Sequence, residues 1–166
     1  MRKVAFFITG LNFGGAELAL LRLLSANEYQ PIVFSLKSDG QLKSHYERNG
    51  VRVIDLGLKV WNYRRNLQLV LKKLDENEIE IICSWLYHAD FFTSCLKILR
   101  PNLKLVWTVH NLSAGKQSIK TSTRIIVYIN ALISYVVPHK IIYCASSAKN
   151  YHENSLNFNK RIGVEI

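Results

Sequence analysis

The chain has 166 residues, of which 49% are hydrophobic and 20% are charged. This length and composition are typical of one globular domain with a full core, and they exclude a disordered chain. Lys and Arg number 22 against 12 Asp and Glu, giving a net charge of +10. That excess favours a polyanionic partner, such as nucleic acid, a phosphorylated ligand or an anionic membrane surface, and charge alone does not choose among them.

The first element is an apolar run over Lys3–Thr9, which predicts a strand. A glycine loop follows at Gly10–Glu17, and a helical pattern covers Ala16–Ala26. A strand, glycine loop and helix in this order present backbone N–H groups and a helix N-terminus to an anion. Gly14 and Gly15 are expected to tolerate positive φ and to leave room for a ligand. The spacing matches neither G-x-G-x-x-G nor the P-loop, and a tight turn without any ligand is the alternative.

Short apolar runs and helical patterns then alternate to the end of the chain. Further strands are expected at 30–36, 51–56, 80–85, 104–109 and 140–145, with helices at 41–49, 66–77, 89–99, 122–137 and 147–154. The strand candidates are continuously apolar, as expected of parallel strands covered on both faces. The pattern predicts one Rossmann-like, doubly wound α/β domain over 1–166, with three layers in the order α/β/α.

Ligands of such sheets bind beyond the carboxyl ends of the strands, where the strand order reverses. In the usual order this edge collects 10–17, 86–90, 110–115 and 146–149. His110 and Asn111 end one strand, ahead of the loop Leu112–Thr121, and are expected to contact a ligand. The alternative is a histidine that only closes the strand end by hydrogen bonding.

The segment Trp85–Asp90 leaves the preceding strand with two aromatic residues, His88 and a carboxylate. A flat apolar ring with directed polar groups suits a sugar. Equally, Trp85 could pack in the core and Asp90 could cap the next helix. Glu17 lies in the first turn after the glycines, where a carboxylate favours the helix dipole and could also accept a ligand hydroxyl.

No metal site is expected. His88 and His110 lack a carboxylate-rich or cysteine partner, and the chain has no D-x-D motif. Its cysteines, Cys83, Cys95 and Cys144, are widely spaced without C-x-x-C, which argues against disulfides and zinc and predicts a cytoplasmic protein.

Two helices suggest how the surface is used. Arg64 and Arg65 just before helix 66–77, and Lys72 and Lys73 on it, are expected to form an ordinary solvated face. Helix Ser122–Val137 is apolar almost all round and too short to span a bilayer. It is expected to be buried or to lie on a membrane, and with Lys116 and Lys120 it predicts peripheral binding to anionic lipid on the inner membrane face.

Together, the Gly-Gly-Ala-Glu opening at 14–17, the pair His110-Asn111 and the pair Ser146-Ser147 resemble the N-terminal domain of retaining GT-B glycosyltransferases of the family 4 type. The resemblance implies one Rossmann-like half of a two-domain enzyme, the half that binds the acceptor. It implies that the backbone of Gly14 and Gly15 lies against the donor diphosphate and that His110, as the catalytic residue, reaches the transferred sugar. Glu17, His88, Asn111 and Ser146 are implied as further substrate-binding residues.

The resemblance also implies what this chain lacks. In the family, a second domain holds the nucleotide-sugar with an E-x7-E pattern, and no two glutamates here are eight apart. A C-terminal donor-binding domain or subunit is therefore an expected partner, and the isolated domain is expected to be inactive. The implied reaction transfers a sugar from a nucleotide-sugar to a glycan or lipid-linked acceptor with retention, with no cofactor and no metal.

Two other functions stay open. One is a non-enzymatic basic α/β module that binds a phosphorylated ligand or a partner protein. The other is a nicotinamide oxidoreductase, although the first loop lacks the third glycine and Asp39 is only a distant candidate for the ribose contact. No nucleic-acid-binding motif is present, so nucleic acid is not an expected partner.

Overall fold

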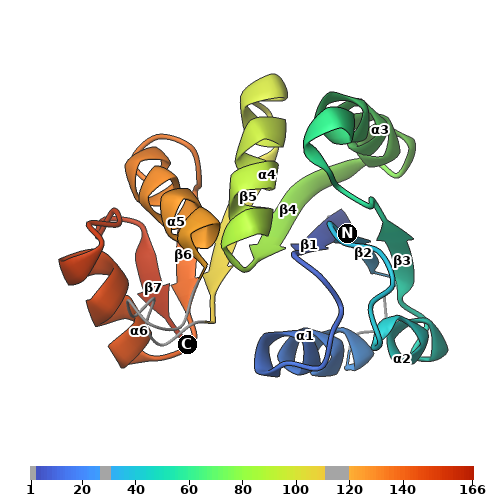
Figure 1. Ribbon diagram of the computed structural model, residues 1–166, viewed down its shortest axis with the longest axis horizontal. Coiled ribbons are helices and arrows are strands. Elements are labelled where there is room, and N and C mark those ends of the chain that lie inside the picture. The colour runs from blue at the N-terminus through green and yellow to red at the C-terminus, as the bar shows by residue number, and fades with distance from the viewer. Residues whose placement is uncertain (1–2, 27–30, 111–119) are drawn as a thin grey trace.

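A computed structural model of the protein describes residues 3–26, 31–110 and 120–166. Within these residues, seven parallel strands form one sheet in the order β3-β2-β1-β4-β5-β6-β7 (Figure 1). They are β1 (Lys3–Ile8), β2 (Ile32–Ser35), β3 (Arg52–Asp55), β4 (Ile79–Trp85), β5 (Lys104–Val109), β6 (Lys140–Tyr143) and β7 (Gly163–Glu165). The chain builds outward from β1 to β3, then returns to β4 and builds the other way, so the strand order reverses between β1 and β4.

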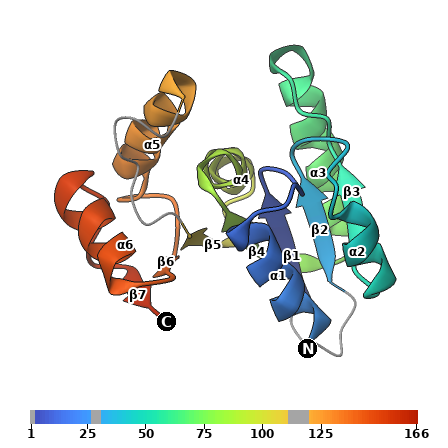
Figure 2. The same ribbon diagram turned by 60° about the horizontal axis from the view of Figure 1, so that its bottom comes forward.

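Helices cover both faces of this sheet. They are α1 (Gly15–Ser25), α2 (Lys43–Arg48), α3 (Tyr63–Glu76), α4 (Tyr87–Leu99), α5 (Thr121–Ile133) and α6 (Ser146–Asn150), with a 3-10 turn η1 (Val60–Asn62) and a π-helical turn η2 (Tyr151–Ser155). In Figure 1, α1 and α2 lie below the strands, and α3, α4 and α5 lie above them. Figure 2 shows the sheet running from β3 on the right to β7 on the left. The predicted three-layer, doubly wound fold is confirmed.

Strand β1 shows why its sequence is continuously apolar. Phe7 stacks on Phe34 of β2 with ring centroids 4.7 Å apart and lies 6.2 Å from the ring of Phe92 on α4. The neighbouring residues Phe6 and Ile8 point to the opposite face, where they join a core cluster that includes Leu20 of α1. Because successive side chains of a strand alternate between faces, a strand covered on both sides needs apolar residues at every position.

The predicted strands are all present, and none of their ends moves by more than two residues. Most helix ends move by one to three residues. Strand 104–109 has the predicted bounds, and β7 lies within the segment 161–166. The main difference is α5, which ends at Ile133 rather than Val137. There the buried Ser134 hydroxyl donates to the Ala131 carbonyl (2.6 Å) and accepts the Asn159 N–H (2.9 Å). This local bonding replaces a further helical turn.

Candidate functional site

The strand register brings the predicted ligand-binding segments to one edge of the sheet. Ile8 pairs with Trp85, and Trp85 pairs with Thr108, so β1, β4 and β5 end at the same level. Tyr143 of β6 pairs with Val109. The segments that follow these strands therefore share the carboxyl edge, which is the usual ligand-binding edge of such a fold.

At this edge, the glycine loop leads directly into α1. Gly14 is the residue before the helix, with extended φ and ψ of −159° and 161°, and its carbonyl accepts the Leu18 N–H at 3.0 Å. Gly14 and Gly15 were expected to tolerate positive φ, but neither uses this freedom, because among the described glycines only Gly50 and Gly57 have positive φ. Backbone strain therefore does not explain the two glycines.

The space around the two glycines explains them better. A Cβ on Gly14 would meet the carboxylate of Glu17, which folds back over this residue. A Cβ on Gly15 would have no described atom within 4 Å. No side chain makes a capping hydrogen bond at the N-terminus of α1 in the described structure. The space over Gly15 at this helix end could admit an anion, with the Glu17 carboxylate lying beside Gly14.

Glu17 itself is held in place through its backbone. Its carbonyl accepts the hydroxyl of the buried Tyr46 on α2 at 2.6 Å. Its carboxylate lies beside Gly14 at the start of α1, as the sequence predicted for a first-turn acid. This position is compatible with both predicted roles, favouring the helix dipole and accepting a ligand hydroxyl.

Trp85 and His110 form the centre of the edge. Their rings stack with centroids 4.0 Å apart and an interplanar angle of 14°. Trp85 is buried and His110 is half-buried, and burial lowers the pKa of His110 below its ordinary value. A neutral imidazole held against an indole has one ring nitrogen that donates and one that accepts a hydrogen bond. The sequence singled out both residues separately, but not their stacking, which depends on the register of β4 and β5.

The turn from β4 into α4 is strained. Leu86 has φ of 74° and ψ of 150°, a conformation that residues other than glycine rarely adopt and that often marks functional sites. It places His88 in the first turn of α4, where this side chain is half-buried. Burial, with a smaller contribution from the charge of Lys37, lowers the pKa of His88.

Lys37 is a cation of this edge that the sequence analysis missed. Its side chain runs over the glycine loop, with Cδ 3.4 Å from the position of a Cβ on Gly10. Its charge acts on His88. Because Lys37 follows β2 closely at the same carboxyl edge, the rule that located the other segments could have located it too.

Asp90 is a structural residue rather than part of the open edge. It is fully buried and accepts the Ser84 hydroxyl at 2.5 Å, while the Thr108 hydroxyl donates to the Ser84 carbonyl at 2.7 Å. Burial raises the pKa of Asp90 well above its ordinary value. The sequence left open that Asp90 caps the next helix and that Trp85 packs in the core. Capping by Asp90 is wrong, because the described helix α4 has no side-chain cap. Core packing holds for Trp85, which also forms the ring stack.

The remaining predicted residues lie on the β6 side or outside the described structure. Ser146 is exposed at the start of α6, and its hydroxyl donates to the Glu165 carboxylate on β7. Asn111 and most of the loop 112–121 lie outside the described residues. Among the residues that are described, no three His, Cys, Asp or Glu side chains are placed to hold a metal ion.

A pocket of about 340 Å³ lies elsewhere, at the amino ends of β4 and β5. Its lining includes Glu80, Arg100 and Lys104. It is therefore on the opposite edge of the sheet from Trp85 and His110.

Among the residues that the structure describes, no helix combines the length and the hydropathy that a transmembrane span requires.

The sheet order and the helices on both faces match structures of GT-B glycosyltransferases. Residues 14–164 match glycosyltransferase family 4, and the chain belongs to this family. A search of curated proteins gives no match.

Three solved structures illustrate the likeness of fold. HepE of Anabaena, solved in complex with UDP, is 14% identical with a TM-score of 0.83 over 99% of this chain and 43% of HepE. A glycosyltransferase of Rickettsia africae is 12% identical with a TM-score of 0.70, over 99% of this chain and 42% of that one. A part of sucrose-phosphate synthase from Thermosynechococcus elongatus is 10% identical with a TM-score of 0.65, over 99% and 87%. This chain thus spans less than half of HepE, which is consistent with an N-terminal GT-B domain.

Proposed function

We propose that this chain is the acceptor-binding half of a retaining glycosyltransferase that takes its sugar from a nucleotide-sugar. The observation that carries the proposal is the space that the described residues leave open over Gly15 at the start of α1, a helix end without a side-chain cap. An anion in this space would meet backbone N–H groups and the positive end of the helix dipole. Lys37, above the same loop, adds a full positive charge. These groups suit the diphosphate of a nucleotide-sugar without a metal ion.

His110 is the proposed catalytic residue. Its neutral ring is fixed by the stack on Trp85, with one nitrogen able to accept and one to donate a hydrogen bond. In this role it contacts the transferred sugar while the bond to the diphosphate breaks. Catalysis then depends on positioning the two substrates and on stabilising the charge that develops on the leaving diphosphate.

The acceptor is proposed to lie on the side of Glu17 and His88. Glu17 supplies a carboxylate beside the glycine loop, and His88 supplies a half-buried imidazole at the strained start of α4. Asn111 and Ser146 are proposed as further substrate contacts. A glycan or a lipid-linked sugar is the class of acceptor that these hydroxyl-binding groups suit.

The donor half is proposed to come from a C-terminal domain or a separate subunit, since HepE is more than twice as long as the part matched here. The test is sugar transfer from nucleotide-sugars by residues 1–166, assayed alone and with a donor-binding domain. We expect no turnover alone and turnover with the added domain. Robust transfer by 1–166 alone would contradict the division into halves. Phosphate-ligand binding without transfer in any combination would favour the non-enzymatic module instead.

A further inference from the structure

The strained turn at Leu86 needs contacts that hold it. Leu86 has φ of 74° and ψ of 150°, and a residue other than glycine keeps such a backbone only where its surroundings fix it. Its carbonyl accepts the N–H groups of Ala89 and Asp90 at 2.9 and 3.0 Å, so the turn also starts α4. Trp85 precedes the turn and His88 follows it. The backbone of this one residue therefore affects how two candidate site residues lie at the carboxyl edge.

Tyr87, directly after the strained residue, is bound through both its side chain and its backbone. Its hydroxyl lies 2.6 Å from Nε2 of His152 in the π-helical turn η2. Its carbonyl accepts a hydrogen bond from the side-chain amide of Asn130 on α5 at 2.8 Å. All three residues are buried, and His152 and Asn130 fully so. Tyr87 is thus fixed to two segments that lie 65 and 43 residues further along the chain.

The surroundings of His152 decide which ring nitrogen accepts the tyrosine hydroxyl. Nδ1 lies 2.7 Å from the carbonyl oxygen of Ala148, and because a carbonyl can only accept, Nδ1 carries the hydrogen. Nε2 is therefore the acceptor for Tyr87. Burial lowers the pKa of His152, which agrees with a neutral ring. The rings of Tyr143 and Phe158, with centroids 5.9 and 5.3 Å from that of the imidazole, keep it in place.

Asn130 connects the same turn to the neighbouring helix. Helices α4 and α5 pack side by side (Figure 1), and Asn130 lies on the face of α5 that also buries Val127 and Ala131. The opposite face of α5 is exposed, for example at Leu132. The helix that the sequence expected to be buried or to lie on a membrane thus buries one face, and the amide on that face binds Tyr87.

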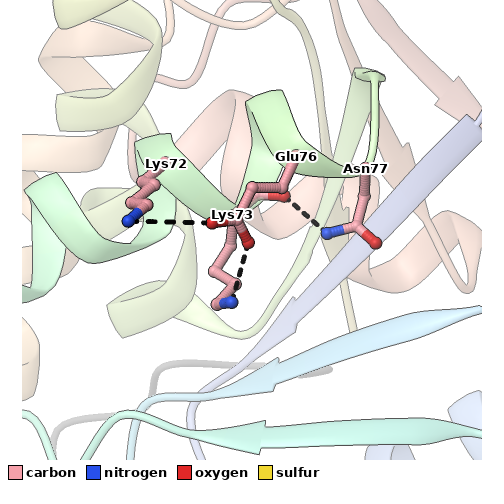
Figure 3. A network of polar contacts seen from close by, with 4 residues as sticks. All are labelled: Lys72, Lys73, Glu76 and Asn77. Atoms are coloured by element: carbon pink, nitrogen blue, oxygen red, sulfur yellow. Dashed lines mark hydrogen bonds and ion pairs between the residues drawn. The ribbon is translucent and has the colours of Figure 1, made fainter.

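These buried bonds differ from the polar contacts on the surface of the same layer. On α3, Lys72 and Lys73 lie 3.9 and 2.7 Å from the Glu76 carboxylate (Figure 3). These side chains are partly or mostly exposed, and exposed pairs of this kind contribute little to stability. Inside the core, water cannot replace a lost partner, so removing one member of the Tyr87 network leaves another unsatisfied.

We propose that His152 and Asn130 are positioning residues, which act through Tyr87 to hold the Leu86 turn and so orient His88 at the carboxyl edge. Both are fully buried, so they act only through Tyr87 and reach no substrate themselves. The catalytic part of this inference rests on the proposed function, in which His88 lies on the acceptor side. The structural part, the dependence of His88 on the hydroxyl of Tyr87, stands without it.

The structural part is tested by NMR on the labelled chain with Tyr87→Phe, which keeps the ring and removes only the hydroxyl. We expect the ring resonances of His88 to shift. We also expect hydrogen exchange at the Ala89 and Asp90 amides to become at least about tenfold faster, because both donate to the Leu86 carbonyl. Unchanged His88 resonances and unchanged exchange, whatever the melting temperature, would overturn the proposal and leave the network as core packing.

Further variants separate positioning from a general loss of packing. Tyr63→Phe is the matched control, since it removes a hydroxyl that contacts the Cys95 sulfur at 3.6 Å in the middle of α4. It should change the exchange less than about twofold. His152→Gln offers an amide oxygen to the Tyr87 hydroxyl and should keep the wild-type His88 resonances, whereas His152→Leu should reproduce the effect of Tyr87→Phe. If His152→Leu does not fold, Tyr87→Phe alone decides.

The catalytic part is tested in the complete enzyme. Tyr87→Phe should raise the KM for the acceptor at least about tenfold and change the KM for the nucleotide-sugar less than about twofold. Equal acceptor KM values for the wild type and Tyr87→Phe would overturn this part. Absence of transfer by the wild type would instead contradict the proposed function, and the NMR result would still decide whether Tyr87 and His152 position His88.

Discussion

The indole of Trp85 and the imidazole of His110 lie parallel, 4.0 Å apart, across the ends of two neighbouring strands. Trp85 is buried in the core cluster that faces α1, whereas His110 is half-buried at the edge. The indole thus fixes the plane of the imidazole by ring stacking and not through a hydrogen bond to an imidazole nitrogen. Among the described residues, the stack itself takes up no polar atom of His110, so its nitrogens are the groups that we expect a ligand to contact.

Replacing His110 should reduce sugar transfer in the complete enzyme. His110→Ala removes the proposed contact to the transferred sugar and is expected to lower kcat/KM at least about tenfold, or about 1.4 kcal/mol. His139→Asn is the matched control, because its side-chain oxygen can still accept the Leu105 N–H that Nδ1 accepts now. Equal kinetics for the two variants, with unchanged melting temperatures, would reduce His110 to a strand-end residue.

Substitutions at Gly15 should separate stability from ligand binding. Gly15→Ala meets no described atom and should leave the free energy of unfolding equal or raise it by up to about 1 kcal/mol, since alanine favours helix. Gly15→Leu should fold equally well but lower kcat/KM at least about tenfold, because its side chain fills the proposed diphosphate space. Urea denaturation and steady-state kinetics provide the two readouts. Near-normal kinetics for Gly15→Leu would leave the glycines as a simple turn.

Lys37 is expected to contribute to phosphate binding and to act on His88. Lys37→Gln should weaken phosphate binding by about 1.5–3 kcal/mol, the usual contribution of a hydrogen bond to a charged group. The same change should raise the pKa of His88, because the charge of Lys37 now lowers it. NMR titration of the His88 ring measures this, with Lys72→Gln as the control. An unchanged His88 pKa would show that the two side chains do not interact.

Asp90 should make stability depend on pH. Its pKa is raised in the folded protein above the ordinary value of 3.8. As the pH rises, the unfolded chain therefore loses this proton first, and stability falls until the folded pKa is passed. Asp90→Asn cannot ionise and keeps an oxygen to accept the Ser84 hydroxyl. Its free energy of unfolding, relative to the wild type, should increase with pH from about 4 upward. A constant difference across this range would contradict a raised pKa.

The sequence predicted the strands and helices well because their signals are local. Continuous apolar runs located β1 and β5, and helical spacing located α3 and α4. Features that depend on how strands align were not predicted. The Trp85–His110 stack requires the register of β4 and β5, and the position of Lys37 over Gly10 requires that of β1 and β2. The strain at Leu86 also left no sequence signal, because leucine does not mark a left-handed backbone as glycine would.

The measurement that tests the central claim most directly is an NMR titration of the ¹⁵N-labelled chain with inorganic pyrophosphate, the simplest probe of the diphosphate. The proposed site predicts that shift changes gather at the carboxyl edge, on the amides of Gly14, Gly15 and Lys37 and near His110. Changes gathered instead around the pocket of Glu80, Arg100 and Lys104 at the opposite edge, or spread evenly over the basic surface, would contradict it.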